Sequence, residues 1–226
     1  MNSSSQSEKT AKMKDNRVPE IISSFDDFII RLYSRIRFQI IPQSFIDDFG
    51  KHLPESGKII DFGCGFGLFS LYYAGQCPQR FIIGVDLDPH RIQVARQAAK
   101  KLGIQNLRYE VADATEWQTD ETFSGIYAFD LIHHLPEECH EAMIQKWRGL
   151  LKPGGVLIIK DVSTRPAWKR MFTYILDRLM VRSSPVHYRS PEEMGDMLTK
   201  AGLRWQSFEV KDYLPYSHIL YVASVG

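Results

Sequence analysis

The chain has 226 residues, and its 28 basic and 27 acidic side chains leave a formal net charge of +1. This balance gives no reason to expect general nucleic-acid binding, although it does not exclude it. No apolar stretch approaches the ~18 residues of a membrane-spanning helix, and the N-terminus has neither an apolar signal core nor a cleavage pattern. The length suits a single α/β domain with a full core.

The chain has three cysteines, an odd number, and none of them forms a CxxC pair: Cys64, Cys77 and Cys139. This pattern argues against a disulfide framework or a zinc site. We therefore expect a protein of the reducing cytoplasm that is not exported.

The N-terminal part divides into two segments. Residues 1–18 are polar, Ser- and Lys-rich and without periodicity, which predicts a disordered leader before a single domain over 19–226. Within 19–50, which we interpret as a helical cover, apolar residues recur at helical spacing: Phe25, Phe28, Ile29, Leu32 and Ile36. We expect this face to pack on the domain. A lid over the active site and peripheral contact with a membrane surface are the alternatives.

A short apolar strand over 58–62 ends in Asp61 and Phe62 and is followed by glycine at every second position, Gly63, Gly65 and Gly67. Such a turn lets the backbone approach a bound nucleoside closely. The dinucleotide pattern GxGxxG needs a third glycine at position 68, where this chain has Leu68.

A second apolar strand over 81–89 carries Asp86 at its end, 21 residues after Gly65. That interval fits one helix and two turns before a neighbouring parallel strand. A third strand leads into VADATEW, residues 111–117, with Asp113.

These three elements in order resemble the class I S-adenosylmethionine-dependent methyltransferases. The resemblance implies S-adenosylmethionine as cofactor and S-adenosylhomocysteine as product, with Asp86 accepting hydrogen bonds from the ribose diol and Asp113 facing the adenine amine. The residues that it places around the cofactor are Asp61, Gly63, Cys64, Gly65, Asp86, Leu87, Asp113, Ala114 and Phe129.

Residues 125–136 resemble the family's fourth strand and the loop that follows it, and 156–162 are expected to form a fifth strand. The helix between them can start at Pro136 and end at the KPGG turn, residues 152–155. The loop after the fourth strand lacks the Pro-Pro-aromatic pattern of exocyclic-amine DNA methylases. A capping box of Ser190 and Glu193 starts the last helix, before two strands near 204–211 and 218–225.

The pattern therefore predicts an α/β fold: a doubly wound, mostly parallel seven-stranded sheet with helices on both faces and a C-terminal antiparallel hairpin.

Residues 163–190 form an insertion rich in aromatic, Met and Arg side chains. We interpret it as a cover over the substrate pocket, with apolar walls and an arginine able to hold an acidic group. Core packing and a solvated charged face are the alternatives. The substrate candidates are Trp168, Phe172, Tyr188 and Arg189.

Methyl transfer needs alignment of two reactants, and a hydroxyl acceptor also has to lose a proton. The candidate bases are His133, His134, Asp161, His187 and Tyr188. Of these we favour His134 and His187, with Asp161 as the third catalytic residue. Local packing of the histidines is the alternative. The HHLPEECH segment does not match a zinc pattern, so we predict no metal.

We therefore predict a cytoplasmic methyltransferase acting on a small, largely apolar acceptor, most simply at oxygen. C- or N-methylation of a lipid or carrier-bound acyl substrate is an alternative, and so is a catalytically silent cofactor-binding partner protein. The sequence does not decide the oligomeric state.

Overall fold

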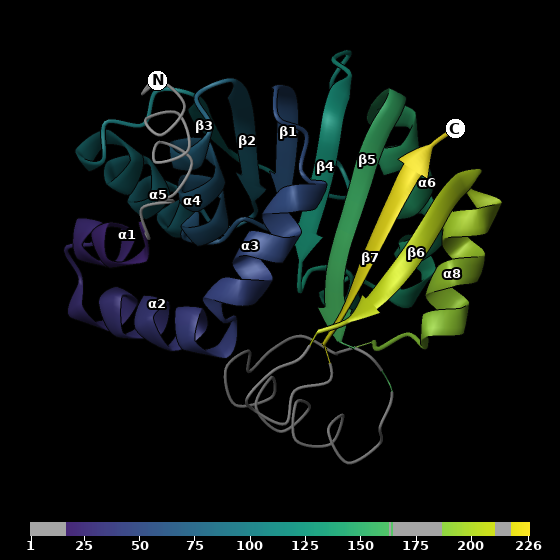
Figure 1. Cartoon of the computed structure of the whole chain (residues 1–226), viewed down its shortest axis with the longest axis horizontal. Helices are drawn as coiled ribbons and strands as arrows, with labels where there is room; N and C mark the ends of the chain where they lie inside the picture. Colours follow the sequence, from purple (N-terminus) through teal and green to yellow (C-terminus); the bar gives the residue numbers. More distant parts are fainter. Residues whose placement is uncertain (1–16, 163, 165–186, 211–217) are drawn as a thin grey trace, which may run out of the picture.

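The computed structural model describes residues 17–162, 164, 187–210 and 218–226. Figure 1 shows one twisted sheet with helices on both faces. The seven strands are β1 (Gly57–Phe62), β2 (Arg80–Asp86), β3 (Leu107–Val111), β4 (Phe123–Phe129), β5 (Leu151–Val162), β6 (Leu203–Glu209) and β7 (His218–Val225). Their order is β3-β2-β1-β4-β5-β7-β6, and only the pairs β5–β7 and β6–β7 are antiparallel. The predicted fold class is confirmed.

The helices lie in two layers. The layer on one face contains α1 (Val18–Ser24), α2 (Phe28–Ile40), α3 (Gln43–His52), α4 (Leu68–Gln76) and α5 (Pro89–Lys101). The other face is covered by α6 (His140–Leu150) and α8 (Pro191–Lys200). Because β1, β2, β3, β4 and β5 run parallel, their carboxyl ends meet at one edge of the sheet, the lower edge in Figure 1. In this sheet type ligands bind at that edge.

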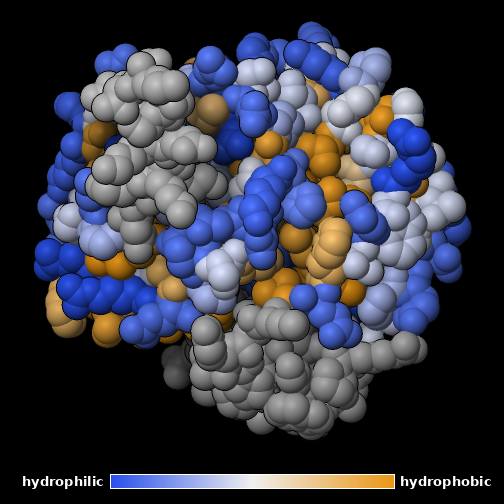
Figure 2. Space-filling view, in the orientation of Figure 1, coloured by the Kyte–Doolittle hydropathy of each residue, from blue (hydrophilic) through white to orange (hydrophobic). Residues whose placement is uncertain are grey.

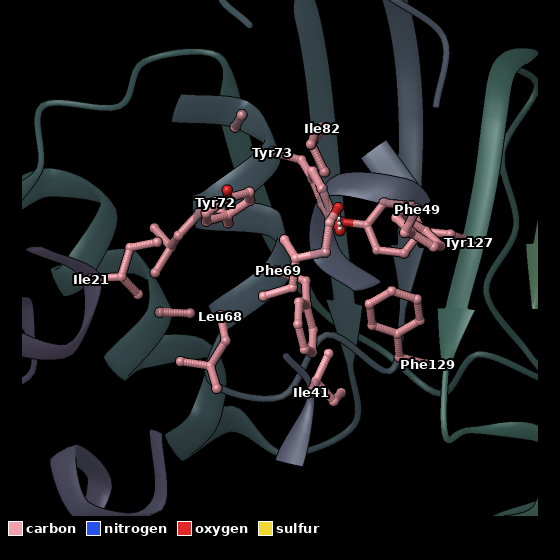
Figure 3. Close-up of a cluster of buried hydrophobic side chains, with 14 of the residues drawn as sticks. Ile21, Ile41, Phe49, Leu68, Phe69, Tyr72, Tyr73, Ile82, Tyr127 and Phe129 are labelled. Atoms are coloured by element: carbon pink, nitrogen blue, oxygen red, sulfur yellow. Dashed lines mark hydrogen bonds between the residues drawn. The ribbon is translucent and has the colours of Figure 1, made fainter. Parts of the chain in front are cut away.

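An aromatic cluster fills the first layer next to this edge. Phe129 at the end of β4 lies with its ring centroid 4.5 Å from Phe49 and 4.6 Å from Phe69, both edge-to-face (Figure 3). Tyr73 donates a hydrogen bond from its hydroxyl to the carbonyl of Ile46, which ties α4 to α3. Such aromatic pairs stabilise the core beyond their buried area. The cluster therefore gives the edge a rigid base.

Several predicted element boundaries shift in the structure. The chain after β4 forms two 3-10 turns, Ile132–His134 and Glu137–Cys139, before α6 begins at His140 rather than at Pro136. The KPGG turn lies within β5 as an irregularity, since Phe123 pairs with Leu151 whereas Gly125 pairs with Val156. The extra residues form a bulge. The capping box of Ser190 and Glu193 is confirmed at the start of α8.

The N-terminal helix packs on the domain as predicted, and Phe25 is buried, but the face of the helix that packs inward is not the predicted one. Asp27 accepts hydrogen bonds from two backbone N–H groups and starts α2 at Phe28, so Phe25 belongs to the preceding turn. The helix buries its opposite side, Ile30, Ser34 and Phe38. The stripe that we expected to pack inward lies on the outer side, and its four helical members are exposed: Phe28, Ile29, Leu32 and Ile36.

Two predicted segments lie largely outside the described residues. The structure does not describe 1–16 of the predicted leader, nor 163 and 165–186 of the predicted insertion. Among the described residues, none of the helices combines the length and the apolar character that crossing a membrane requires.

Candidate active site

The glycine turn joins β1 to α4 at the carboxyl edge of the sheet. Gly67 has a φ of 76°, and a Cβ atom there would meet the Tyr109 hydroxyl at 2.1 Å, so only glycine fits. Gly65 also has a positive φ, of 55°, but a Cβ atom there would have no neighbour within 4 Å. The backbone of Gly63 is left-handed too. The turn is therefore packed on its inner side and open at Gly65, where a ligand can approach the main chain.

Asp86 lies beside this open part of the turn. One of its carboxylate oxygens accepts the Gly65 N–H at 2.8 Å, and the other accepts the Asp88 N–H at 3.0 Å. Backbone amides therefore fix the carboxylate in place between the ends of β1 and β2. The next side chain, Leu87, is 67% exposed. A fixed carboxylate with an apolar neighbour suits a ribose diol next to a flat base.

The turn after β3 is also held by local hydrogen bonds. Asp113 accepts bonds from the backbone N–H and the hydroxyl of Thr115, at 2.8 and 2.6 Å. Lys146 on α6 donates to the carbonyls of Ala114 and Thr115. Asp113 and Ala114 thus sit in a rigid turn at the same edge as Asp86.

Asp61 is buried directly below the glycine turn. Its carboxyl accepts a hydrogen bond of 2.6 Å from the Ser70 hydroxyl on α4. Burial raises the pKa of Asp61 to about 7, and the nearby negative charge of Asp86 adds to this shift, although the bond from Ser70 opposes it. Asp61 therefore binds protons near neutral pH.

Two predicted cofactor contacts are packed against protein. Burial raises the pKa of the Cys64 thiol, which keeps it protonated and unreactive. Phe129 is 7% exposed and belongs to the aromatic cluster of Figure 3. Their contacts with the cofactor stay predictions.

The charges of this half of the edge suit a cationic cofactor. Within the described part of the chain, no ion pair neutralises Asp61, Asp86 or Asp113. S-adenosylmethionine carries a sulfonium and an ammonium group, and unpaired carboxylates favour such a ligand. The open turn at Gly65 and the exposed Leu87 leave room for its nucleoside part. The residues present therefore fit this cofactor.

A buried carboxylate–imidazole pair lies at the ends of β4 and β5. Asp161 is 5% exposed and His133 is 2% exposed, and the carboxylate bonds to Nδ1 of the imidazole. The backbone N–H of Val162 donates a second bond to the same carboxylate oxygen, at 2.8 Å. The carboxylate therefore orients the ring and holds a proton on Nδ1, which makes Nε2 the basic atom.

Asp130, the residue after β4, is held by two cations. Lys160 on β5 lies 2.6 Å from one carboxylate oxygen, and Arg37 on α2 pairs with the other. Burial alone would raise the pKa of Asp130, but Lys160 and Arg37 hold it well below its usual range. Its backbone has a φ of 52°, which is uncommon outside glycine.

Asp130, His133 and Asp161 bring their ligand atoms within 4.8 Å of one another, as a metal site would. The carboxylate of Asp130 already faces the charges of Lys160 and Arg37, which would repel a metal ion. This cluster is better described as an ion-pair network.

The other predicted catalytic and substrate residues surround this pair. The ring of His134 lies 4.1 Å from that of His133, and the ring of Tyr188 lies 5.6 Å from it. His187 donates its backbone N–H to the His133 carbonyl at 2.8 Å. The structure therefore brings together His133, His134, Asp161 and Tyr188, with the His187 backbone beside them.

Arg189 is engaged elsewhere. Its guanidinium pairs with Glu137 at 2.8 Å, lies 3.7 Å from Glu193 and donates to His140. These bonds join the loop before α6 to the start of α8, so its role as a substrate ligand stays a prediction. Trp168 and Phe172 lie outside the described residues.

Sequence reasoning missed two residues of the network and did not identify which histidine bonds to Asp161. Lys160 left a signal, because it interrupts an apolar strand that is buried on both faces. Arg37 left none, since it pairs with a residue 93 positions away. Both histidines were candidates, but only the fold shows that His133 is the one bonded to Asp161.

The comparisons with known proteins agree with this geometry. Residues 59–155 match the family model described as "Methyltransferase domain". The ubiquinone biosynthesis O-methyltransferase of Xanthomonas axonopodis pv. citri is 27% identical over 171 residues, which cover 72% of this chain and 69% of that protein. Phosphoethanolamine N-methyltransferase 3 of Arabidopsis thaliana is 33% identical over 116 residues, which cover 50% of this chain and 23% of that protein.

Solved structures share the fold. The magnesium protoporphyrin IX methyltransferase of Synechocystis PCC 6803, with bound S-adenosylhomocysteine, has a TM-score of 0.67 at 16% identity and covers 88% of each chain. An O-methyltransferase family protein from Burkholderia thailandensis has a TM-score of 0.69 at 17% identity, covering 93% of this chain and 67% of that one. The domain match over 59–155, together with the carboxylates around the glycine turn, supports a class I S-adenosylmethionine-dependent methyltransferase, and these solved structures share its fold.

Proposed function

We propose that this methyltransferase transfers a methyl group to an oxygen of a small, largely apolar acceptor. The observation that carries the proposal is the His133–Asp161 pair at the ends of β4 and β5, in the same edge as the glycine turn. A hydroxyl acceptor needs a base, whereas an amine that is already neutral does not. A carboxylate-oriented imidazole is suited to that proton transfer.

The cofactor supplies, when bound, a methyl group activated on a sulfonium. In the proposed arrangement Asp86 would orient the ribose of the cofactor, and Asp113 and Leu87 would border its base. The open turn at Gly65 would let the cofactor contact the protein main chain. His133 takes the hydroxyl proton on Nε2, while Asp161 keeps Nδ1 protonated and stabilises the imidazolium. The new bond joins the acceptor oxygen to the methyl carbon, and the bond from that carbon to sulfur breaks.

Related proteins support oxygen as the acceptor atom. Relatives that match over more than two thirds of their length are named as ubiquinone biosynthesis O-methyltransferases. Others that match over a smaller share are N-methyltransferases. We propose a phenolic or similarly acidic hydroxyl, since a hydroxyl of lower pKa loses its proton to imidazole more readily. The free cysteines support a reducing cytoplasmic location.

The first test is cofactor binding by calorimetric titration with S-adenosylhomocysteine, with NAD as the control. We expect binding of the former alone. The purified chain is then incubated with S-adenosylmethionine and a panel of apolar phenols, together with matched anilines of the same shape. Methyl transfer to the phenols supports the proposal, and transfer to the anilines alone contradicts it.

Histidine variants identify the base within the same assay. His133→Ala lowers turnover about 100-fold or more if His133 takes the proton. His134→Ala and His187→Ala test the residues favoured from sequence. The matched control is His52→Ala at the end of α3, whose ring packs on Phe208 of β6, the outermost strand of the sheet and two strands away from β5. A larger loss for His134→Ala than for His133→Ala would move the role of base to His134.

A further inference from the structure

Helix α2 has apolar side chains on two opposite sides. Its inner side buries Ile30 and Phe38. Its outer side exposes Phe28 by 66%, Ile29 by 74%, and Leu32 and Ile36 by 45% each. At about 100° per residue, these four positions fall on one side of the helix roughly 100° wide. We call these four residues the outer stripe of α2.

Single exposed apolar residues are common, but a contiguous set on one helix marks an interaction surface. A helix that lies on a globular domain normally presents polar residues to water on its outer side. Figure 2 shows hydrophobic surface, in orange, at the lower left of the molecule, where α2 lies in Figure 1. The outer stripe therefore favours a partner that covers it.

The charges beside the stripe indicate the nature of that partner. Arg31 and Arg35, one helical turn apart, flank the stripe, and no ion pair engages either within the described residues. The two acidic residues at the start of the helix already have other partners, because Asp27 caps α2 and Asp26 pairs with Lys101. An apolar stripe bordered by free arginines complements a layer of anionic headgroups above hydrocarbon.

The position of α2 places this surface next to the candidate active site. Figure 1 shows the helix along the carboxyl edge of the sheet, where the cofactor turn and the His133–Asp161 pair lie. Arg37 on the same helix pairs with Asp130 at the end of β4. This ion pair anchors α2 at the edge where the acceptor is expected, so a partner on the stripe lies next to the active site.

We propose that the outer stripe of α2 docks the protein on an anionic lipid surface. The four apolar side chains insert at the boundary between headgroups and acyl chains, while Arg31 and Arg35 contact lipid phosphates. A second copy of the chain is a poorer partner, because a two-fold contact would place these arginines near their own copies. Docking holds the carboxyl edge near the membrane, where an apolar acceptor is concentrated.

Sedimentation of the full chain with vesicles tests the proposal. We expect binding to phosphatidylcholine vesicles that contain about 30% phosphatidylglycerol, and weaker binding to phosphatidylcholine alone. The double variant Ile29→Gln/Leu32→Gln keeps helix propensity and lowers the bound fraction about tenfold or more. Phe208→Gln on β6 replaces another exposed apolar residue and is the matched control. It should bind like the parent.

Substitution of the two arginines tests the contact with lipid headgroups separately from the insertion of apolar side chains. Arg31→Gln and Arg35→Gln each weaken binding to the anionic vesicles about fivefold and reduce its dependence on salt. Neither affects binding to phosphatidylcholine alone. This pattern separates headgroup contact from apolar insertion.

Three outcomes overturn the proposal. The first is no sedimentation with anionic vesicles, or equal sedimentation of the parent and the Ile29→Gln/Leu32→Gln variant. The second is a halved molar mass in solution for that variant, which would show that a second copy covers the stripe. The third is a fall of more than about 4 °C in its unfolding midpoint, which would show that the chain covers its own stripe.

Discussion

The carboxyl edge of the sheet holds its carboxylates in two different ways. We call the ends of β1, β2 and β3 the cofactor half and the ends of β4 and β5 the acceptor half, after the ligands that we propose for them. On the cofactor half, backbone amides fix Asp86 and a hydroxyl bonds Asp61, and no cation pairs with either among the described residues. On the acceptor half, Lys160 and Arg37 neutralise Asp130, and an imidazole bonds Asp161. One half keeps its negative charge available, and the other compensates it internally.

This difference fits the ligand that we propose for each half. A cationic cofactor gains from carboxylates that are fixed but unpaired, because its own charges complete the compensation. A neutral apolar acceptor would gain nothing from a free charge, and an unpaired buried carboxylate near it would cost several kcal/mol. The comparison predicts that variants on the acceptor half change turnover or stability, whereas variants on the cofactor half change cofactor affinity or protonation.

The largest expected effect is that of Asp161→Asn on turnover. The amide keeps the size of the side chain but no longer fixes the tautomer of His133, so we expect turnover to fall about 10²- to 10⁴-fold. Affinity for S-adenosylhomocysteine should stay the same, because Asp161 lies on the acceptor half. Steady-state rates and calorimetry measure the two effects. Turnover within about threefold of the parent would remove the pair from the chemistry.

The next effect concerns the stability of the ion-pair network. Lys160→Met removes the fully buried cation beside the largely buried Asp130, which then keeps its pairing with Arg37, and we expect the free energy of unfolding to fall by about 3 to 5 kcal/mol. The side chain of Arg37 is 21% exposed, against 0% for Lys160, so Arg37→Met should cost less. Urea denaturation measures both.

A double variant separates charge from packing at this site. Asp130→Asn keeps the shape, and asparagine tolerates the positive φ of this position. Added to Lys160→Met, it should recover a large part of the lost stability, since the side chain that Lys160 compensated is then neutral. Additive losses would show that the two side chains act independently.

The two halves also differ in what the sequence could predict. Asp61, Gly65 and Asp86 could be placed together at the carboxyl edge because their positions follow from spacing within one turn or one βα unit. The alternation of strands and helices and the helix cap at Ser190 follow from local patterns in the same way. Such features need only short-range spacing.

The acceptor half depends on contacts between distant parts of the chain. Arg37 and Asp130 are 93 residues apart, and His133 and Asp161 are 28 apart. Spacing along the sequence does not distinguish His133 from His134 as the partner of Asp161. The periodicity of α2 likewise marked an apolar face, but both sides of the helix are apolar. Tertiary packing decides which side is buried.

On the cofactor half, Asp86→Ala should weaken binding of S-adenosylhomocysteine by about 1.5 to 3 kcal/mol, because hydrogen bonds to a charged group are lost. This corresponds to about a 10- to 150-fold rise in Kd. Calorimetric titration measures it, and Asp120→Ala, an exposed acid after β3, is the control. Unchanged affinity would show that Asp86 acts only through its bond to Gly65.

The smallest effect, a pH dependence of stability, comes from Asp61. Its pKa is about 7 in the folded protein, against an ordinary pKa of 3.8 for an aspartate side chain. Between these values the folded state binds more protons than the unfolded state, so the contribution of Asp61 to stability falls as pH rises. From pH 5 to pH 7 this loss amounts to about 2 kcal/mol. It runs opposite to the contribution of Asp130, whose lowered pKa favours the folded state at higher pH.

Asp61→Asn isolates this contribution, because the amide oxygen can still accept the bond from Ser70 while no charge forms. We expect the variant to gain stability relative to the parent as pH rises from 5 to 7, and Asp120→Asn to show no such gain. Urea denaturation at several pH values gives the difference. Saturating S-adenosylhomocysteine sharpens the test, since its ammonium favours the ionised carboxylate if the two are close. The parent should then lose its pH dependence in this range. A parent that keeps the same pH dependence with ligand bound would place Asp61 outside the reach of the cofactor charge.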